Sequence, residues 1–261
     1  MIISHKYKFL FIGLPFSASS AISKELNKKY EGQARLRKHS LYHEFLETAT
    51  IEEKKYFVFA VIRNPMETEI TSYEKMKNNI KGNFSNVALY KHSGGHITEK
   101  QRKKFEFIQK EQASFERFFL QFYRQPYDNL ASLTVPYCDF VIRYENIQED
   151  YITALKKAGI KDPLPLPLAN KTFGKKNKIT DYYTKKTQGR AVSVFGPFLE
   201  KYDYSFPVEW GEIKVSTYHK LKFKLISYLK KIKIKYFTIR KKKKSIKGSI
   251  YGNIQRTQSN K

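Results

Sequence analysis

The sequence contains a single cysteine, Cys138, among 261 residues. One cysteine cannot form an internal disulfide or a cysteine-rich zinc site, and it suits a reducing, cytoplasmic compartment. The six histidines show no metal-ligand spacing, so no metal site is expected. Long uncharged apolar runs are also missing, and the sequence predicts no transmembrane helix. The apolar N-terminal stretch is too short for a signal peptide and is expected to form a buried strand.

Acidic residues are scarce, and the last fifth of the chain has none. The formal net charge is +26, and residues 213–261 contain sixteen Lys and Arg but no Asp or Glu. Such a surface favours anionic partners, namely nucleotides, acidic glycans, nucleic acid or an anionic membrane, without choosing among them. A run such as Arg240–Lys244, RKKKK, strengthens the attraction but reads no base sequence. Sequence-specific nucleic-acid binding is therefore not expected.

Apolar and aromatic residues are plentiful enough for a globular core, at 41% and 15%. Strand and helix patterns alternate along the first 210 residues, which predicts an α/β domain with a central parallel sheet between two helix layers. A basic, partly helical tail is expected at 211–261. The strands are predicted at 6–13, 35–40, 56–62 and 140–144, and the helices at 19–30, from 64 onward, and at 99–123, 149–158 and 181–202.

A tight loop joins the first predicted strand to the first predicted helix, within FIGLPFSASSAISKEL at Phe11–Leu26. A strand–loop–helix unit directs backbone N–H groups and the positive helix end at one point, which suits a phosphate-like anion. Ser17, Ser19 and Ser20 add hydroxyl donors. The Walker pattern is absent, so a magnesium–nucleoside triphosphate site is not expected. In the alternative interpretation, the serines only cap the helix.

A second polar motif follows the predicted strand at 56–62. Arg63 stands at the end of this strand, and Thr71 and Ser72 lie about two turns into the next helix. The carboxyl ends of parallel strands form the ligand crevice of α/β sheets, where an arginine fork and a hydroxyl can hold a terminal phosphate. The alternative is an ordinary capped helix that begins at Asn64, with one surface arginine.

Together the two motifs resemble the sulfotransferases that use 3'-phosphoadenosine 5'-phosphosulfate (PAPS). Pro15–Ser20, PFSASS, is similar to the 5'-phosphosulfate loop of that family, and Arg63, Thr71 and Tyr73 are similar to its 3'-phosphate motif. Three further segments match in order, so that the resemblance covers roughly residues 5–207: RLRKHSLYHEF at 35–45, FVIRYENIQED at 140–150 and FGPFLEKYDYSFP at 195–207.

The resemblance implies a P-loop-like nucleotide-binding fold, PAPS as co-substrate, and sulfuryl transfer to a hydroxyl acceptor, which we expect to be a carbohydrate. It also implies that a basic late loop at 171–178 closes on the 3'-phosphate through Lys175. The residues expected to bind the nucleotide are Ser17, Ala18, Ser19, Ser20, Arg63, Thr71, Ser72 and Lys175.

One departure from the family pattern concerns catalysis. Phe16 stands where family members carry the Lys or Arg that stabilises the leaving phosphate. We expect Lys38 to supply this cation and the neighbouring His39 to be the base, because imidazole titrates near neutrality. His43 is the second choice for the base. The alternative to an enzyme is a degenerate, non-catalytic member of the fold that binds a nucleotide or a polyanion.

The tail has an amphipathic pattern. Leu221, Leu225 and Leu229 recur on one helical face with lysines between them. The pattern is compatible with an interfacial helix on the inner face of an anionic membrane. An anionic polymer as the partner, and a solvated extension without a partner, are the alternatives.

Overall fold

The computed structural model describes residues 1–167, 174–175, 178–237 and 250–259. The chain divides into two compact units. Unit 1 comprises Met1–Arg63, Asn129–Ala169 and Lys231–Lys261, and unit 2 comprises Asn64–Asp128 and Asn170–Lys230. The predicted division into residues 1–210 and a tail differs from this arrangement, because both units contain segments from each of those parts.

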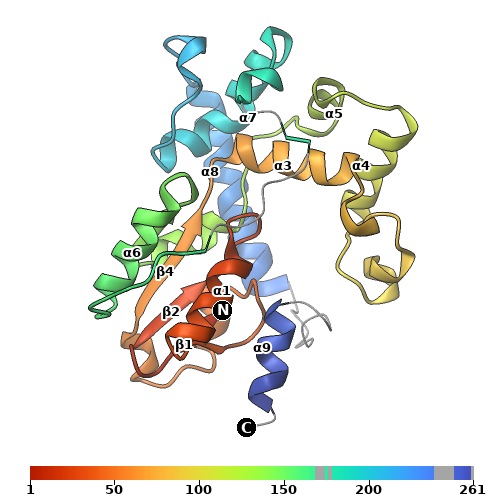
Figure 1. The fold of residues 1–261 in the computed structure, drawn as a ribbon. Helices are drawn as coiled ribbons and strands as arrows, with labels where there is room; N and C mark the ends of the chain where they lie inside the picture. The colour runs from red at the N-terminus through yellow and green to blue at the C-terminus, as the bar shows by residue number, and fades with distance from the viewer. Residues whose placement is uncertain (168–173, 176–177, 238–249, 260–261) are drawn as a thin grey trace. The chain divides into compact units, whose positions relative to one another are not determined.

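Unit 1 contains a five-stranded sheet in the order β3-β1-β2-β4-β5 (Figure 1). β2, β4 and β5 are parallel, as the sequence predicts, whereas β1 pairs antiparallel with both β2 and β3. The sheet is therefore mixed, and the expectation of a wholly parallel sheet is wrong at this edge. The strands are β1 Ile2–Ser4, β2 Phe9–Ile12, β3 Gln33–Ala34, β4 Phe57–Ile62 and β5 Phe140–Arg143.

The length of the connection explains the antiparallel edge. Only four residues, 5–8, join β1 to β2, and Lys8 has a left-handed φ of 49°. A link this short can only reverse the chain, since a parallel pairing needs a crossover of about a dozen residues. The strand predicted at 35–40 is also wrong, because pairing on that side stops at Ala34.

Both faces of the sheet carry buried apolar residues. Phe9, Phe11, Phe59 and Val61 share a core cluster with residues of α1 Ser19–Lys29 and α6 Ile147–Lys157. The alternate residues Leu10, Ile12, Val58 and Ala60 pack instead with Phe45 of α2 Tyr42–Leu46. Burial on both faces explains the unbroken apolar sequence of β4.

The end of the described chain is part of unit 1. In α9, Ile250–Ser259, the Tyr251 side chain is 1% exposed, and its hydroxyl lies 2.5 Å from the carbonyl oxygen of Met1. The Gln258 side chain accepts a hydrogen bond of 2.9 Å from the backbone N–H of Ala34 in β3. Residues 250–259 are therefore a packed helix, whereas Arg240–Lys244 lie outside the described residues.

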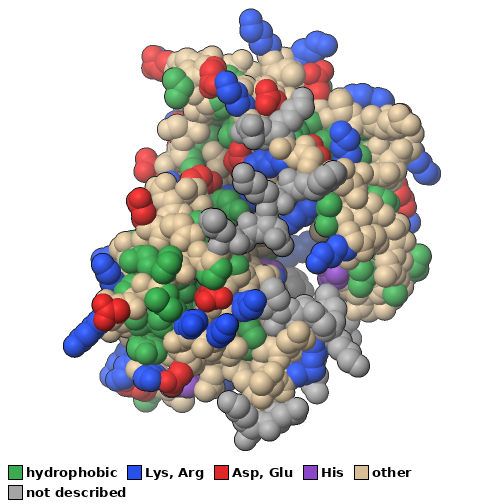
Figure 2. All heavy atoms as spheres, viewed as in Figure 1, with side chains coloured by type: hydrophobic (Ala, Val, Ile, Leu, Met, Phe, Trp, Pro, Cys, Tyr) green, Lys and Arg blue, Asp and Glu red, His purple; other side chains and the backbone are tan. Residues whose placement is uncertain are grey.

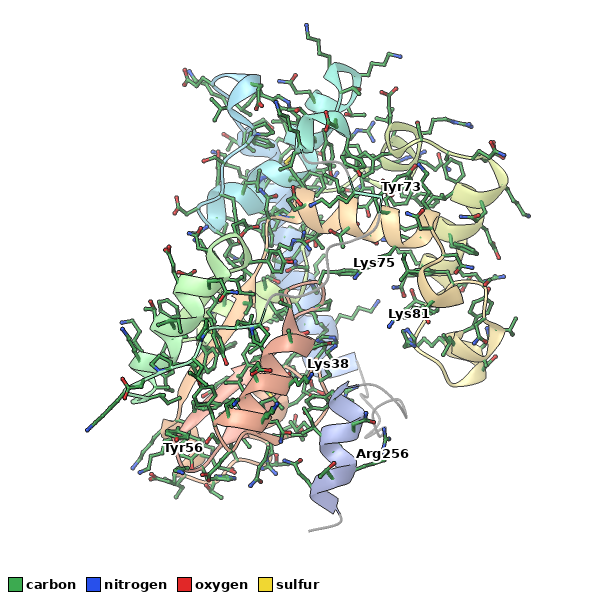
Figure 3. All side chains as sticks on the ribbon, viewed as in Figure 1. Lys38, Tyr56, Tyr73, Lys75, Lys81 and Arg256 are labelled. Carbon is green, nitrogen blue, oxygen red and sulfur yellow. The ribbon has the colours of Figure 1, made fainter. Side chains whose placement is uncertain are left out.

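The described part of unit 2 is helical and has an aromatic core. The helix predicted at 99–123 is two helices, because the chain turns at Gln112, with a φ of 40°, and Ser114 caps the second. The Tyr73 hydroxyl donates to the carbonyl of Ala113 at 2.8 Å and thereby ties this turn to α3 (Figure 3). The helices are α3 Pro65–Lys77, α4 Glu99–Lys110, α5 Phe115–Phe122, α7 Lys185–Lys201 and α8 Thr217–Ile232.

Short helical turns occupy many of the connections. The region 78–95, predicted as a loop, contains three of them. The single turns are Glu53–Lys55, Ile80–Gly82, Val87–Leu89, Lys91–Ser93, Leu130–Leu133, Val135–Tyr137, Tyr144–Asn146, Ile179–Asp181, Val208–Trp210 and the π-helical Lys233–Phe237.

Within the described residues, no helix is both long and apolar enough to cross a lipid bilayer.

Candidate functional site

The loop between β2 and α1 has an unusual backbone. Phe16 and Ala18 both adopt left-handed conformations, with φ of 62° and 53°. Each costs roughly 1 kcal/mol or more in a residue with a Cβ atom, so the surrounding structure must impose them. The Ser17 hydroxyl, almost fully buried, donates to the carbonyl of Leu14 at 2.8 Å and closes the loop. Left-handed residues at such a turn can direct successive N–H groups toward one anion.

Ser19 and Ser20 form the first turn of α1, directly after this loop. Neither is the N-cap residue, because Ala18 occupies that position and makes no side-chain cap hydrogen bond. Ser20 instead contacts a cation: the Lys38 ammonium donates to its hydroxyl oxygen at 2.5 Å (Figure 3). The Lys38 ammonium therefore reaches the first turn of α1, directly after the loop.

His39 lies against the end of β2. Its Nδ1 donates a hydrogen bond of 2.7 Å to the carbonyl oxygen of Gly13. A Cβ on Gly13 would come within 2.9 Å of the Ser19 Cβ and 3.3 Å of the Lys38 carbonyl oxygen, so the close approach of these segments requires glycine. A proton on Nδ1 leaves the lone pair of the neutral ring on Nε2, which is the form of a general base.

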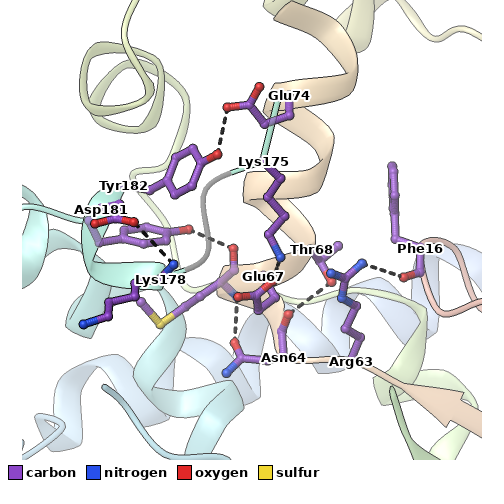
Figure 4. Close-up of polar contacts among 12 residues, drawn as sticks. Phe16, Arg63, Asn64, Glu67, Thr68, Glu74, Lys175, Lys178, Asp181 and Tyr182 are labelled. Carbon is purple, nitrogen blue, oxygen red and sulfur yellow. Dashed lines mark hydrogen bonds and ion pairs between the residues drawn. The ribbon is translucent and has the colours of Figure 1, made fainter. Parts of the chain in front are cut away.

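Arg63 projects from the end of β4 toward the same loop. Its guanidinium donates to the carbonyl oxygen of Phe16 at 3.3 Å (Figure 4). It also stacks over the ring of Tyr144, 4.2 Å from Cζ to the ring centroid. Tyr144 follows β5, so the carboxyl ends of the three parallel strands contribute to one site. Tyr144 is not among the site residues predicted from the sequence, although an aromatic residue after the third parallel strand was a usable signal.

The other predicted nucleotide-binding residues belong to unit 2. Thr71 is 2% exposed, and its hydroxyl has no hydrogen-bond partner among the described residues. Lys175 forms an ion pair with Glu67 of α3 (Figure 4). Ser72 lines a cavity between α3, α4 and α5. That Arg63 and Thr71 hold one phosphate stays a prediction.

This cavity of unit 2 contains a polar cluster that was not predicted from the sequence. Lys104 is 8% exposed, and its ammonium donates to the Tyr123 hydroxyl at 2.5 Å. The Tyr123 hydroxyl donates in turn to the Glu69 carboxylate. The cavity has a volume of about 550 Å³. On the basic helix α4, Lys104 looks like any other solvated lysine, so the sequence offers no signal for its burial.

Burial lowers the pKa of Lys104 to about 8, against the opposing effect of Glu69. The unfolded chain keeps the ordinary pKa near 10.5 and so binds more protons between about pH 8 and 10.5, where raising the pH stabilises the fold. We expect the free energy of unfolding to gain about 2 kcal/mol from this group between about pH 7.5 and 9.5. Denaturant titrations should show a smaller gain in Lys104→Met, whereas exposed Lys110→Met, at the end of the same helix, should behave like wild type. An unchanged gain in Lys104→Met would contradict the prediction.

Lys and Arg side chains are scattered over the face shown in Figure 2, and the whole chain has a formal net charge of +26. Among the described residues, no group of three or more His, Cys, Asp or Glu side chains could hold a metal ion. Comparisons of the chain with protein-family models, with curated proteins and with solved structures found no match.

Proposed function

We propose that this protein is a PAPS-dependent sulfotransferase with a P-loop-like nucleotide site in unit 1. The observation that carries the proposal is the convergence of the loop after β2 with Lys38, His39 and Arg63. Lys38 and His39 lie in one segment of the sequence and Arg63 in another, and each of the three makes a hydrogen bond to residues 13–20. Charge-bearing groups at the carboxyl ends of parallel strands suit an anionic nucleotide.

In the proposed reaction, the acceptor hydroxyl oxygen attacks the sulfur in line with the bond to the phosphate. The new oxygen–sulfur bond forms as the bond from sulfur to the bridging oxygen breaks. The leaving 3'-phosphoadenosine 5'-phosphate keeps the electron pair, and His39 Nε2 takes the acceptor proton. Lys38 and the loop N–H groups stabilise the charge on the leaving phosphate. Positioning and electrostatics therefore supply most of the acceleration.

Lys38 can supply the positive charge that Phe16 lacks. The side chain at position 16 is apolar, but the ammonium of Lys38 lies at Ser20, within the same loop-and-helix unit. A cation from the segment after β3 can neutralise the leaving group as well as one from the loop, because the interaction depends on distance rather than on sequence position.

We propose that the cavity of unit 2 binds a sugar. Side-chain amides, a hydroxyl and aromatic rings line it, a combination suited to the polar edges and apolar faces of a sugar ring. It also includes Thr98, directly before α4. The amides are those of Gln101 and Gln121, the hydroxyl is that of Thr98, and the aromatic rings include those of Phe122 and Tyr127.

A second candidate function is nucleotide or polyanion binding without turnover, and Phe16 is the observation that favours it. A protein of this kind would keep the anion loop and Arg63 but would not use His39 as a base. Both candidates predict nucleotide binding, and only the enzyme predicts transfer of the sulfuryl group to an acceptor.

The test of the nucleotide site is calorimetric binding of 3'-phosphoadenosine 5'-phosphate, with AMP and ATP as comparisons. We expect clear preference for the 3'-phosphorylated nucleotide and a loss of at least tenfold in Arg63→Ala, since hydrogen bonds to charged groups contribute about 1.5–3 kcal/mol. Exposed Arg256→Ala in α9 removes the same charge and should bind normally. Equal affinity for AMP and for 3'-phosphoadenosine 5'-phosphate would contradict the proposal.

A further inference from the structure

Helix α8 exposes a stripe of large apolar side chains on unit 2. Within Thr217–Lys230, five large apolar side chains are each more than half exposed, at 53–64%. Their spacing of three, four, three and one residues places them within about a third of the circumference of the helix. They are Tyr218, Leu221, Leu225, Tyr228 and Leu229.

The opposite side of α8 is attached to unit 2. Phe223 is 3% exposed, and Lys220 pairs with Glu200 of α7 at 2.8 Å. Lys230 pairs with Asp128 at 3.1 Å, and the Asp128 side chain is only 2% exposed. These contacts fix the rotation of the helix about its axis, so the leucines face outward because the other side is already packed.

Lysines border the apolar stripe on both sides. At 100° per residue, Lys222 lies next to Tyr218 on one edge, with its ammonium 5.4 Å from that ring centroid, and Lys224 lies beyond the other edge. The sequence Thr217–Ile232 contains no Asp or Glu. An apolar stripe with lysines along both edges is typical of helices that lie in a membrane interface.

We propose that α8 docks unit 2 on an anionic lipid surface. The stripe enters the boundary between headgroups and acyl chains, and the bordering lysines contact lipid phosphates and carboxylates. This inference is independent of the proposed sulfuryl transfer.

The charges favour lipid over other occupants. Two copies of α8 packed through their stripes would place lysines against lysines, with no carboxylate on either helix to pair with them. A nucleic acid would use the lysines but would leave the five apolar side chains in water. An anionic membrane satisfies both features at once.

The experiment is co-sedimentation of the full chain with vesicles of phosphatidylcholine alone and with vesicles that also contain phosphatidylserine. We expect binding only to the anionic vesicles, a loss of at least tenfold in partitioning for the pair Leu221→Gln and Leu225→Gln, and a several-fold loss for the pair Lys222→Gln and Lys224→Gln. Val208→Gln, at a side chain 91% exposed elsewhere in unit 2, is the matched control and should bind normally.

The leucine pair separates this proposal from attraction by charge alone, because it leaves Arg240–Lys244 and every other cation in place. Wild-type binding by the leucine pair, or equal binding to the neutral vesicles, would overturn the proposal. So would a dimer in light scattering that the leucine pair dissociates, or binding confined to heparin or duplex DNA. All substituted side chains are at least partly exposed, and circular dichroism with thermal unfolding verifies that the variants fold.

Discussion

Replacing His39 with Asn is expected to lower the turnover of PAPS by about 10²–10⁴-fold and to leave the affinity for 3'-phosphoadenosine 5'-phosphate within about twofold. In the wild type, His39 Nδ1 donates to the Gly13 carbonyl oxygen at 2.7 Å. Asparagine keeps an N–H donor for this carbonyl, but it has no nitrogen that can accept a proton. The ground-state nucleotide site should therefore persist while the proton transfer is lost.

The control for this prediction is His43→Asn, in α2, at the second histidine of the same segment. It should retain wild-type turnover if His39 is the base. The acidic limb of the pH profile should disappear in the His39 variant and remain in the His43 variant. The reverse pattern would transfer the role to His43, and loss of nucleotide affinity together with turnover in His39→Asn would point to a structural role.

Replacing Lys38 with Met is expected to reduce turnover by about 10²–10³-fold, because it removes the cation that reaches Ser20. The leaving phosphate would then develop charge next to loop N–H groups alone. Nucleotide affinity should fall much less, since the ammonium matters most where charge increases in the transition state. Exposed Lys28→Met in α1 removes an equal charge from the same unit and should leave turnover unchanged.

The double variant Phe16→Lys with Lys38→Met makes this prediction specific. A lysine at position 16 carries the cation on the loop itself, in a backbone conformation that Phe16 already adopts at a φ of 62°. We expect it to recover much of the turnover lost in the single Lys38 variant. Full activity of Lys38→Met by itself would show that the site needs no cation there. An inactive double variant would show that Lys38 acts in another way.

Local patterns predicted the elements whose burial follows a simple period. The continuous apolar run of β4 and the helical pattern of α1 appear where the sequence predicts them. The meeting of Arg63 with the loop was also predictable, because each directly follows a parallel strand and such strands end at one edge. Chain connectivity supplied this information without any knowledge of side-chain packing.

Features set by contacts distant in the sequence were not predictable. The pairing of β1 with β3 joins residues distant in the sequence, such as Ile2 and Ala34, and β1 is too short for a clear pattern. The burial of Lys104 depends on Tyr123 and Glu69, which come from other helices. Neither residue type nor periodicity carries these relationships, because the energy of a buried group depends on what tertiary packing places around it.

Helix α8 contains both kinds of information. The sequence by itself determined that its leucines share one face and that its charges are all basic. Only the tertiary structure decided which face turns inward, because Phe223 and the ion pairs of Lys220 and Lys230 with the rest of unit 2 stabilise one rotation of the helix. That rotation leaves the leucines exposed to solvent.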